Sequence, residues 1–220
     1  MSKKFTDLQG KATKSGPDRM KFVEGRNRFR IVSPVVPAYK YWLKTKDGTS
    51  VPMECLGFDR EKEKFTNIKK DWVRHYFPEM KCSWAYSSFV IDGTDGKVKL
   101  LDFKKKLFEQ ILHAAKSKLG DPSDPDNGWW IVCTRTKTGP KVFNVEYTLE
   151  VFELEKTPLS DTEKALLENL PDIEEVLRQQ TPEEQREFIE NNILADEEEK
   201  EEEEQEFNGA DDDLDDEIPF

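Results

Sequence analysis

Positive side chains recur beside aromatic rings in the early part of the chain, at spacings that favour a shared surface. They form two triplets with alternate spacing: Arg26, Arg28 and Arg30, then Lys40, Trp42 and Lys44. In an extended strand, residues two apart point to the same face. Such a face suits a nucleic acid strand, because cations neutralise phosphates and flat rings stack on bases. We expect these six residues to form one binding surface.

Later segments add further cations and rings to this set of candidates. They are Lys81, Trp84, Tyr86, Lys104, Lys105, Lys106, Arg135 and Lys137. The three consecutive lysines stand near the predicted start of a helix, whose positive end disfavours each exposed lysine by about 0.3–1 kcal/mol. Their presence there indicates phosphate contact. Most of the 24 Phe, Trp and Tyr residues must be buried, and the sequence leaves Trp129 and Trp130 open between core and DNA-facing positions.

Motifs for catalysis and metal binding are missing from the sequence. There is no GxxxxGK[ST], GxGxxG, GxSxG or HExxH, and His75 and His113 are the only histidines. The three cysteines lack CxxC spacing, although Cys55 and Cys82 could meet His75. We therefore predict no enzyme, no cofactor and no metal. No apolar run approaches the ~20 residues of a membrane span, so we expect no membrane contact and a cytoplasmic location.

Charge divides the chain into a basic body and an acidic end. Residues 195–220 carry 15 carboxylates and one lysine, a net charge of −14, although the whole chain is only −12. The preceding residues 158–194 are also acidic, which leaves residues 1–157 at +9. Four parts are expected from this: a flexible basic arm (1–19), a binding body (20–157), a short acidic helical segment (158–194) and a disordered acidic tail (195–220).

The body shows the two-residue period of β-strands, which one helical segment interrupts. KDG at 46–48 and TGP at 138–140 predict hairpin turns. A helix is expected over 103–119, with Asp102 as its N-cap. The last strand should point five residues inward: Phe143, Val145, Tyr147, Leu149 and Val151. Capping boxes SDTE and TPEE predict short helices within the acidic segment.

Five or six strands with one inserted helix favour a small closed antiparallel barrel. The OB-fold is a five-stranded member of that class, and its open face and loops bind nucleic acid strands or oligosaccharides. The expected fold is therefore mainly β, an OB-fold-like barrel with one inserted helix, followed by short acidic helices and a disordered tail. A β-sandwich is the alternative.

The last residues, LDDEIPF, resemble the acidic end of bacterial single-stranded DNA-binding proteins, in which a carboxylate run precedes Ile-Pro-Phe. Glu217 stands where an Asp is usual. The resemblance implies that this tip recruits replication and repair proteins, which hold the terminal Pro-Phe and its carboxylate in a small basic and apolar pocket. The implied contact residues are Asp215, Asp216, Glu217, Ile218, Pro219 and Phe220.

The body resembles the single-stranded DNA-binding proteins of T-even and related bacteriophages. FRIVSP, the SWA of residues 83–85 and GKVKLLDFKKKLFEQI fall in the order that this family shows, across roughly residues 25–155. The resemblance implies that Trp84 belongs to a DNA cleft. It also places a zinc module between the second strand and SWA, where this chain offers only Cys55, His75 and Cys82, so we predict no zinc.

These patterns together predict a phage protein that coats single-stranded DNA during replication, recombination or repair, without sequence preference. The −14 tail should compete with DNA for the basic groove as a tethered polyanion. Two rivals stay open: an acidic-tailed interaction module, such as a chaperone or DNA mimic, and an RNA-binding regulator. The sequence leaves the oligomeric state open, with monomers binding along a strand as one arrangement.

Overall fold

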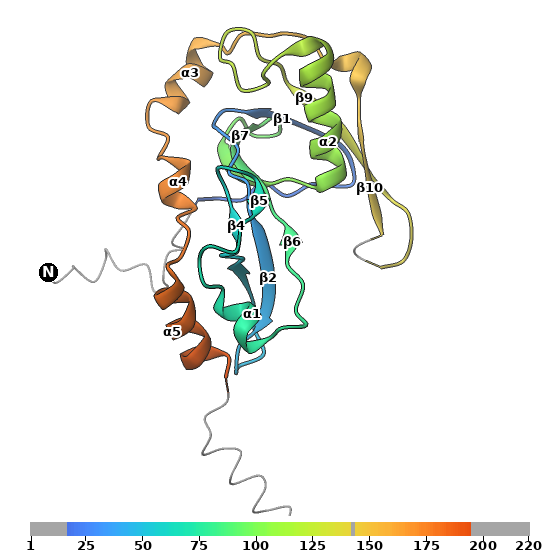
Figure 1. Cartoon of the computed structure of the whole chain (residues 1–220). Coiled ribbons are helices and arrows are strands. Elements are labelled where there is room, and N and C mark those ends of the chain that lie inside the picture. Colours follow the sequence, from blue (N-terminus) through green and yellow to red (C-terminus); the bar gives the residue numbers. More distant parts are fainter. Residues whose placement is uncertain (1–16, 142–143, 195–220) are drawn as a thin grey trace, which may run out of the picture. The chain divides into compact units, whose positions relative to one another are not determined.

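The computed structural model describes residues 17–141 and 144–194, which divide into two compact units (Figure 1). The first unit contains residues 17–38 and 84–178, and the second contains 39–83 and 179–194. The body expected over residues 20–157 therefore contributes to both units. The expected flexible arm, except for residues 17–19, and the expected disordered tail lie outside the described residues.

A five-stranded antiparallel sheet forms the centre of the first unit, with the strand order β10-β9-β1-β7-β8. Its strands are β1 (Gly25–Ile31), β7 (Ser87–Asp92), β8 (Val98–Asp102), β9 (Ile131–Lys137) and β10 (Val145–Leu149). Between the described strands no ladder joins the edges β8 and β10, so the sheet is open. The mainly β class is confirmed. Because an OB-fold is itself a partly open five-stranded barrel, this sheet is compatible with it.

One helix interrupts the strand series between β8 and β9, as expected. It is α2 (Lys105–Ala114), and it continues as the π-helical turn η2 (Ala115–Leu119). Its buried face has the helical spacing seen in the sequence: Leu107, Ile111 and Ala114. The expected N-cap is wrong, because Asp102 is the last residue of β8 and accepts a hydrogen bond from Ser87 Oγ at 2.6 Å. Lys104 occupies the N-cap position instead.

The acidic helices at the start of residues 158–194 pack into the first unit. They are α3 (Asp161–Leu167) and α4 (Ile173–Val176). Ile173 is buried with Leu159 against Phe89 and Leu100 of the sheet. The predicted capping box at α3 is confirmed, because Ser160 Oγ accepts from Glu163 N while the Glu163 carboxylate accepts from Ser160 N.

The second unit is built on a hairpin whose turn falls at the predicted KDG. Its elements are β2 (Tyr39–Lys44), β3 (Ser50–Glu54), β4 (Phe58–Asp59), β5 (Lys64–Phe65), α1 (Trp72–Tyr76), β6 (Ser83–Trp84, at the unit boundary) and α5 (Pro182–Asn192). Ile189 of α5 is buried with Tyr41, Leu43 and Val73. The capping box at Thr181 is confirmed.

The last strand of the first unit ends earlier than its alternation suggests. β10 stops at Leu149, and a 3-10 turn η3 (Val151–Glu153) follows. The inward position expected for Val151 is wrong, since its side chain is exposed once the strand has ended. Leu149 is buried as expected, and Phe143 lies outside the described residues.

Candidate nucleic-acid interface

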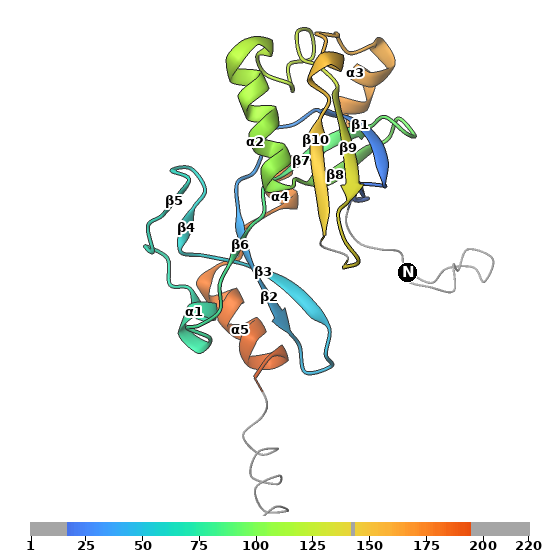
Figure 2. The ribbon, with the colours of Figure 1, turned by 90° about the vertical axis from the view of Figure 1, so that its right-hand side faces the viewer.

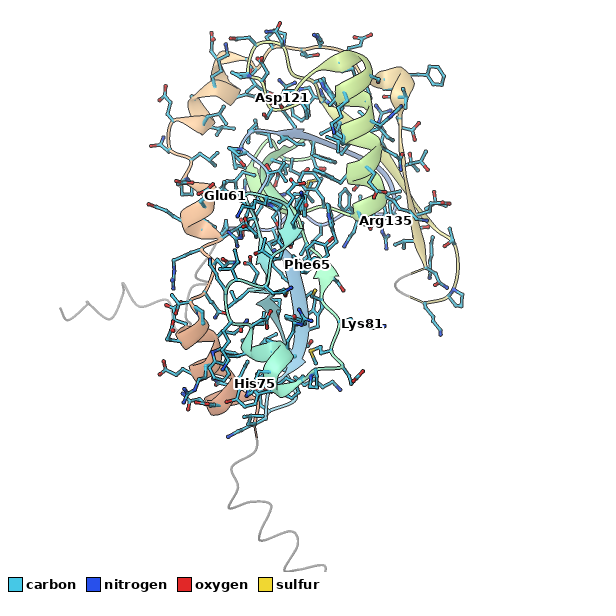
Figure 3. All side chains as sticks on the ribbon, viewed as in Figure 1. Glu61, Phe65, His75, Lys81, Asp121 and Arg135 are labelled. Atoms are coloured by element: carbon cyan, nitrogen blue, oxygen red, sulfur yellow. The ribbon has the colours of Figure 1, made fainter. Side chains whose placement is uncertain are left out.

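A groove of about 1110 Å³ opens on the first unit where β10, the end of β9, the start of α2 and residues 19–22 meet. Figure 2 shows β9 and β10 as neighbours with α2 beside them, and Figure 3 shows Arg135 near the start of α2. Among the described residues, six cations line the groove against the acids Asp102 and Glu146. The cations are Arg19, Lys21, Lys104, Lys105, Lys106 and Arg135.

Most of this positive charge has no counter-charge within the described chain. Arg19 forms an ion pair with Asp102, and Lys105 Nζ lies 3.9 Å from a carboxylate oxygen of Glu109. The other four groove cations have no ion-pair partner in residues 17–141 and 144–194: Lys21, Lys104, Lys106 and Arg135. Like charges gathered without partners repel one another, so an anion that enters the groove gains from all four.

The start of α2 adds to the positive potential of the groove. Lys104, at the N-cap, has an extended backbone and makes no side-chain capping hydrogen bond, and the first turn contains no acid. The first amide groups of a helix have no partner within it, and the helix dipole places partial positive charge at this end. Lys105 and Lys106 therefore add their charge where the helix is already positive, as expected from the sequence.

Two aromatic rings lie in the same groove. Phe22 and Tyr147 are half-buried, and their ring centroids are 5.0 Å apart at an interplanar angle of 66°. Tyr147 is held in place by Gln110 of α2, which donates to Tyr147 O at 3.0 Å and accepts from Leu149 N at 2.9 Å. The groove thus combines cations with rings on which bases can stack.

The groove contains both predicted and unpredicted residues. Arg135 and the three lysines 104–106 are among the candidates from the sequence, whereas Arg19, Lys21 and Phe22 are not. Tyr147, expected to point into the core, lines the groove instead. The stretch RMKF at 19–22 interleaves cations with a ring just as KYWLK does at 40–44, and this signal was present. Lys137 is exposed two residues beyond Arg135 on β9 but does not line the groove.

The arginine triplet on β1 separates into two exposed residues and a buried one. Arg26 is exposed and forms an ion pair with Glu153. Arg28 is also exposed, and its guanidinium lies 4.0 Å from the ring centroid of Trp130. The predicted DNA contact of Arg30 is wrong, because its side chain is fully buried.

Arg30 instead ties loops of the first unit together. Its Nη1 donates to Thr157 O at 3.0 Å and its Nη2 to Asp124 O at 2.7 Å. Burial lowers the pKa of Arg30, although the nearby carboxylates Glu163, Asp124 and Asp121 oppose the shift. The alternation of β1 places Arg30 on the face of Arg26 and Arg28, but the 124–128 and 157–159 segments cover that end of the strand.

Trp84 and Tyr86 form a stack whose exposure is unequal. Their ring centroids are 4.3 Å apart at 17°, and Phe108 of α2 touches both rings. Trp84 is half-buried, whereas Tyr86 is 8% exposed. The direct DNA contact predicted for Tyr86 is therefore wrong, because its ring is buried and stacks against the ring of Trp84. Trp129, left open by the sequence, is core and donates from Nε1 to Gly120 O at 3.0 Å.

The second unit presents its own basic and aromatic face. Trp42 is 60% exposed on β2, Lys44 is exposed and Lys40 is half-buried, while Tyr41 and Leu43 are buried on the opposite face. This alternation is as predicted. Lys81 is exposed as well. Because β1 and β2 belong to different units, the single surface expected from both triplets stays a prediction.

The second unit also contains the cysteine and histidine residues considered for zinc. Cys55 is buried and accepts a hydrogen bond from Tyr41 Oη at 3.2 Å, and burial raises the pKa of its thiol to about 12. His75 packs its ring against Trp72 and Tyr76. Within the part of the chain that the structure describes, no three His, Cys, Asp or Glu side chains are grouped to hold a metal ion.

Comparison with known proteins finds one similar phage protein. No family model matches the chain. One curated protein, described as a probable ssDNA-binding protein of Escherichia phage T5, is 35% identical over 133 residues. The chain resembles a phage single-stranded DNA-binding protein. The match includes 53% of this chain and 52% of the relative, so the chain spans about half the length of that protein. Among the described helices, none has the length and apolar character to cross a membrane.

Proposed function

We propose that this chain binds single-stranded DNA without regard to base sequence. The observation that carries the proposal is the groove of the first unit, where four unpaired cations and the uncapped start of α2 lie beside Phe22 and Tyr147. The description of the similar phage T5 protein as a probable ssDNA-binding protein supports it.

The groove suits a single strand because it offers both kinds of contact that such a strand provides. Phosphates meet Lys21, Lys104, Lys106 and Arg135, and unpaired bases have flat faces for Phe22 and Tyr147. In a duplex the bases are stacked inside the helix, so their flat faces cannot reach these two rings and only the phosphates remain for contact. We infer that the half-buried Trp84 of the first unit and the exposed Trp42 of the second unit each offer a further ring on which a base can stack.

The proposed role is protective and involves no reaction. By occupying strands exposed during phage DNA replication, recombination and repair, the protein keeps them from pairing and from nucleases. This action needs no cofactor, and it takes place in the cytoplasm of the infected cell. A monomer that binds along the strand is sufficient for it.

Residues 195–220 have two proposed roles, and they lie outside the described residues. We propose that their net charge of −14 competes with DNA for the groove, and that the segment 215–220 binds replication and repair proteins. Deleting residues 195–220 should strengthen DNA binding, most clearly at low salt, where screening is weak. Unchanged affinity at low salt would contradict the competition.

The proposed function is tested by titrating the full chain with three ligands of equal length: oligo-dT, oligo-rU and a mixed-sequence duplex. Tryptophan fluorescence should be quenched most by oligo-dT, and affinity should fall linearly on a log-log plot against salt. Preference for the duplex, or no binding, would refute the proposal. Equal binding of oligo-rU would favour the RNA-binding rival.

A further inference from the structure

An apolar knob projects from the first unit immediately after β10. It consists of Val151 and Phe152 on the 3-10 turn, with exposed fractions of 61% and 104%. The turn is anchored, since Glu150 N donates to Val132 O at 2.9 Å and Glu153 N to Glu150 O at 3.0 Å. A phenylalanine ring that is fully exposed on an anchored turn forgoes the free energy that it would gain by burial. This exposure therefore indicates a binding partner for the ring.

The charges around the knob argue against nucleic acid as that partner. Glu150, Glu153 and Glu155 flank the knob in the sequence, within a run of six residues. Glu153 is paired with Arg26, and Glu150 accepts from Thr134 Oγ1 at 2.7 Å, which leaves Glu155 exposed. Carboxylates next to the knob in the sequence disfavour the approach of phosphates. The knob is therefore suited to a protein surface that is apolar, with a cation at its rim.

A groove with those properties lies elsewhere on the same unit. We call it the apolar groove; its volume is about 410 Å³, and α2, η2, residues 31–35 and the loop 120–123 line it. Phe108, Ile111 and Ala115 form its wall, and Leu112 is 39% exposed beside them. Lys116 stands at the groove and has no carboxylate partner among the described residues. The acid of the groove, Asp121, accepts hydrogen bonds from Ser123.

We propose that the knob of one copy of this chain inserts into the apolar groove of the next copy. The chain does not place its own knob in its own groove, because Phe152 is fully exposed. A contact between two different patches is head-to-tail, and repeated copies then form an open row. Lys116 of one copy meets the acidic surroundings of Phe152 in the next. The inference rests on the proposed function, since a bound strand aligns copies in such a row.

The consequence is cooperative binding to long strands. Copies on a strand of one site length have no neighbour, so the knob and the groove contribute nothing there. On a longer strand each added copy buries a phenylalanine in a preformed apolar groove. We expect Phe152→Ala and Leu112→Gln each to lower the affinity for long strands about 10- to 100-fold, equivalent to about 1.4–2.8 kcal/mol.

The test compares oligo-dT of one site length with oligo-dT of several site lengths, after the site size has been measured by stoichiometry on poly-dT. Val23→Ala is the control for Phe152→Ala, because Val23 is also an exposed apolar residue, at 59%. Leu166→Gln is the control for Leu112→Gln, because Leu166 on α3 is 37% exposed and Leu112 is 39% exposed. The variants at 152 and 112 should bind the short strand like wild type and lose affinity only on the long one. Their double variant should be no weaker than either single variant, because both remove the same contact.

Several results would overturn the proposal. Long-strand affinity that is unchanged in both variants excludes the contact, and additive losses in the double variant assign the two patches to different partners. A loss with Leu112→Gln but not Phe152→Ala gives the groove another occupant, such as residues 195–220. Failure of wild type on the short strand refutes the proposed function instead.

A cross-linking arm separates this inference from DNA binding. On a Cys82→Ser background that keeps Phe152 and Leu112 intact, mixing Glu155→Cys protein with Lys116→Cys protein under mild oxidation should give a mixed dimer, even without DNA, at high protein concentration. The remaining native thiols, Cys55 and Cys133, are buried. A mixed dimer supports the contact even if DNA binding fails, and its absence with and without DNA overturns it.

Discussion

Removing two groove lysines should reduce the salt dependence of DNA binding by a calculable amount. Lys104 and Lys106 lie at the start of α2, and neither has an ion-pair partner among the described residues. Single-stranded binding has a log-log salt slope of roughly −0.7 for each phosphate neutralised. If all four unpaired cations contact phosphate, the groove contributes about −2.8, and Lys104→Ala/Lys106→Ala should lower that contribution to about −1.4.

The difference is large enough to measure directly. Between 50 and 200 mM salt, a slope of about −2.8 weakens binding ~50-fold, whereas about −1.4 weakens it only ~7-fold. The assay is fluorescence titration with oligo-dT at five or more salt concentrations. Folding should be unaffected, since both lysines are exposed and neither caps the helix with its side chain.

A matched double variant controls for the loss of two charges. Lys97→Ala/Lys156→Ala removes two exposed lysines of the same unit that do not line the groove. This control should leave the salt slope close to that of wild type, because counterion release depends on phosphate contact. An unchanged slope in the Lys104/Lys106 variant, or an equal change in both variants, would refute the assignment of the groove.

Three further predictions follow from buried and exposed groups. Arg30→Met should destabilise the fold by about 2–4 kcal/mol, because the hydrogen bonds from the buried guanidinium to Thr157 O and Asp124 O are lost, while the salt slope stays unchanged; thermal unfolding and titration check both parts. Trp42→Ala should weaken oligo-dT binding about 5- to 150-fold, equivalent to ~1–3 kcal/mol for a lost stacking base, with the melting temperature as the control. Burial raises the pKa of Cys55 and Cys133 to about 12, so at pH 8 a thiol reagent should modify Cys82 well before these two thiols, and equal reactivity of all three would contradict the prediction. Because the folded pKa values of Cys55 and Cys133 exceed the unfolded value, the stability that these two thiols contribute is complete below about pH 8.5 and is lost as the pH rises toward the folded value.

Local chemistry made much of the fold predictable. The capping boxes at Ser160 and Thr181 place helices from four residues each, and the alternation of β2 correctly separates Trp42 from Tyr41. These signals succeed because the side chains that determine them are close in sequence. The predicted N-cap is wrong because Asp102 ends β8 instead, where it pairs with Ser87 of the neighbouring strand β7, a contact that the residues around the helix start do not indicate.

The candidate site was only partly predictable, because burial depends on loops that pack over a strand from far along the chain. Arg30 continues the pattern of Arg26 and Arg28, yet its partners Thr157 and Asp124 lie about a hundred residues away. No periodicity within β1 could indicate that cover. The lysines 104–106 were found because their position conflicts with the helix dipole, a local signal that tertiary packing does not erase.

The most direct test of the central claim is amide hydrogen exchange of the full chain with and without saturating oligo-dT. Bound DNA should slow exchange at residues 19–22, at the start of α2 and along β10, because these segments line the groove. Protection confined to α3 and α4, with no change at the groove, would contradict it.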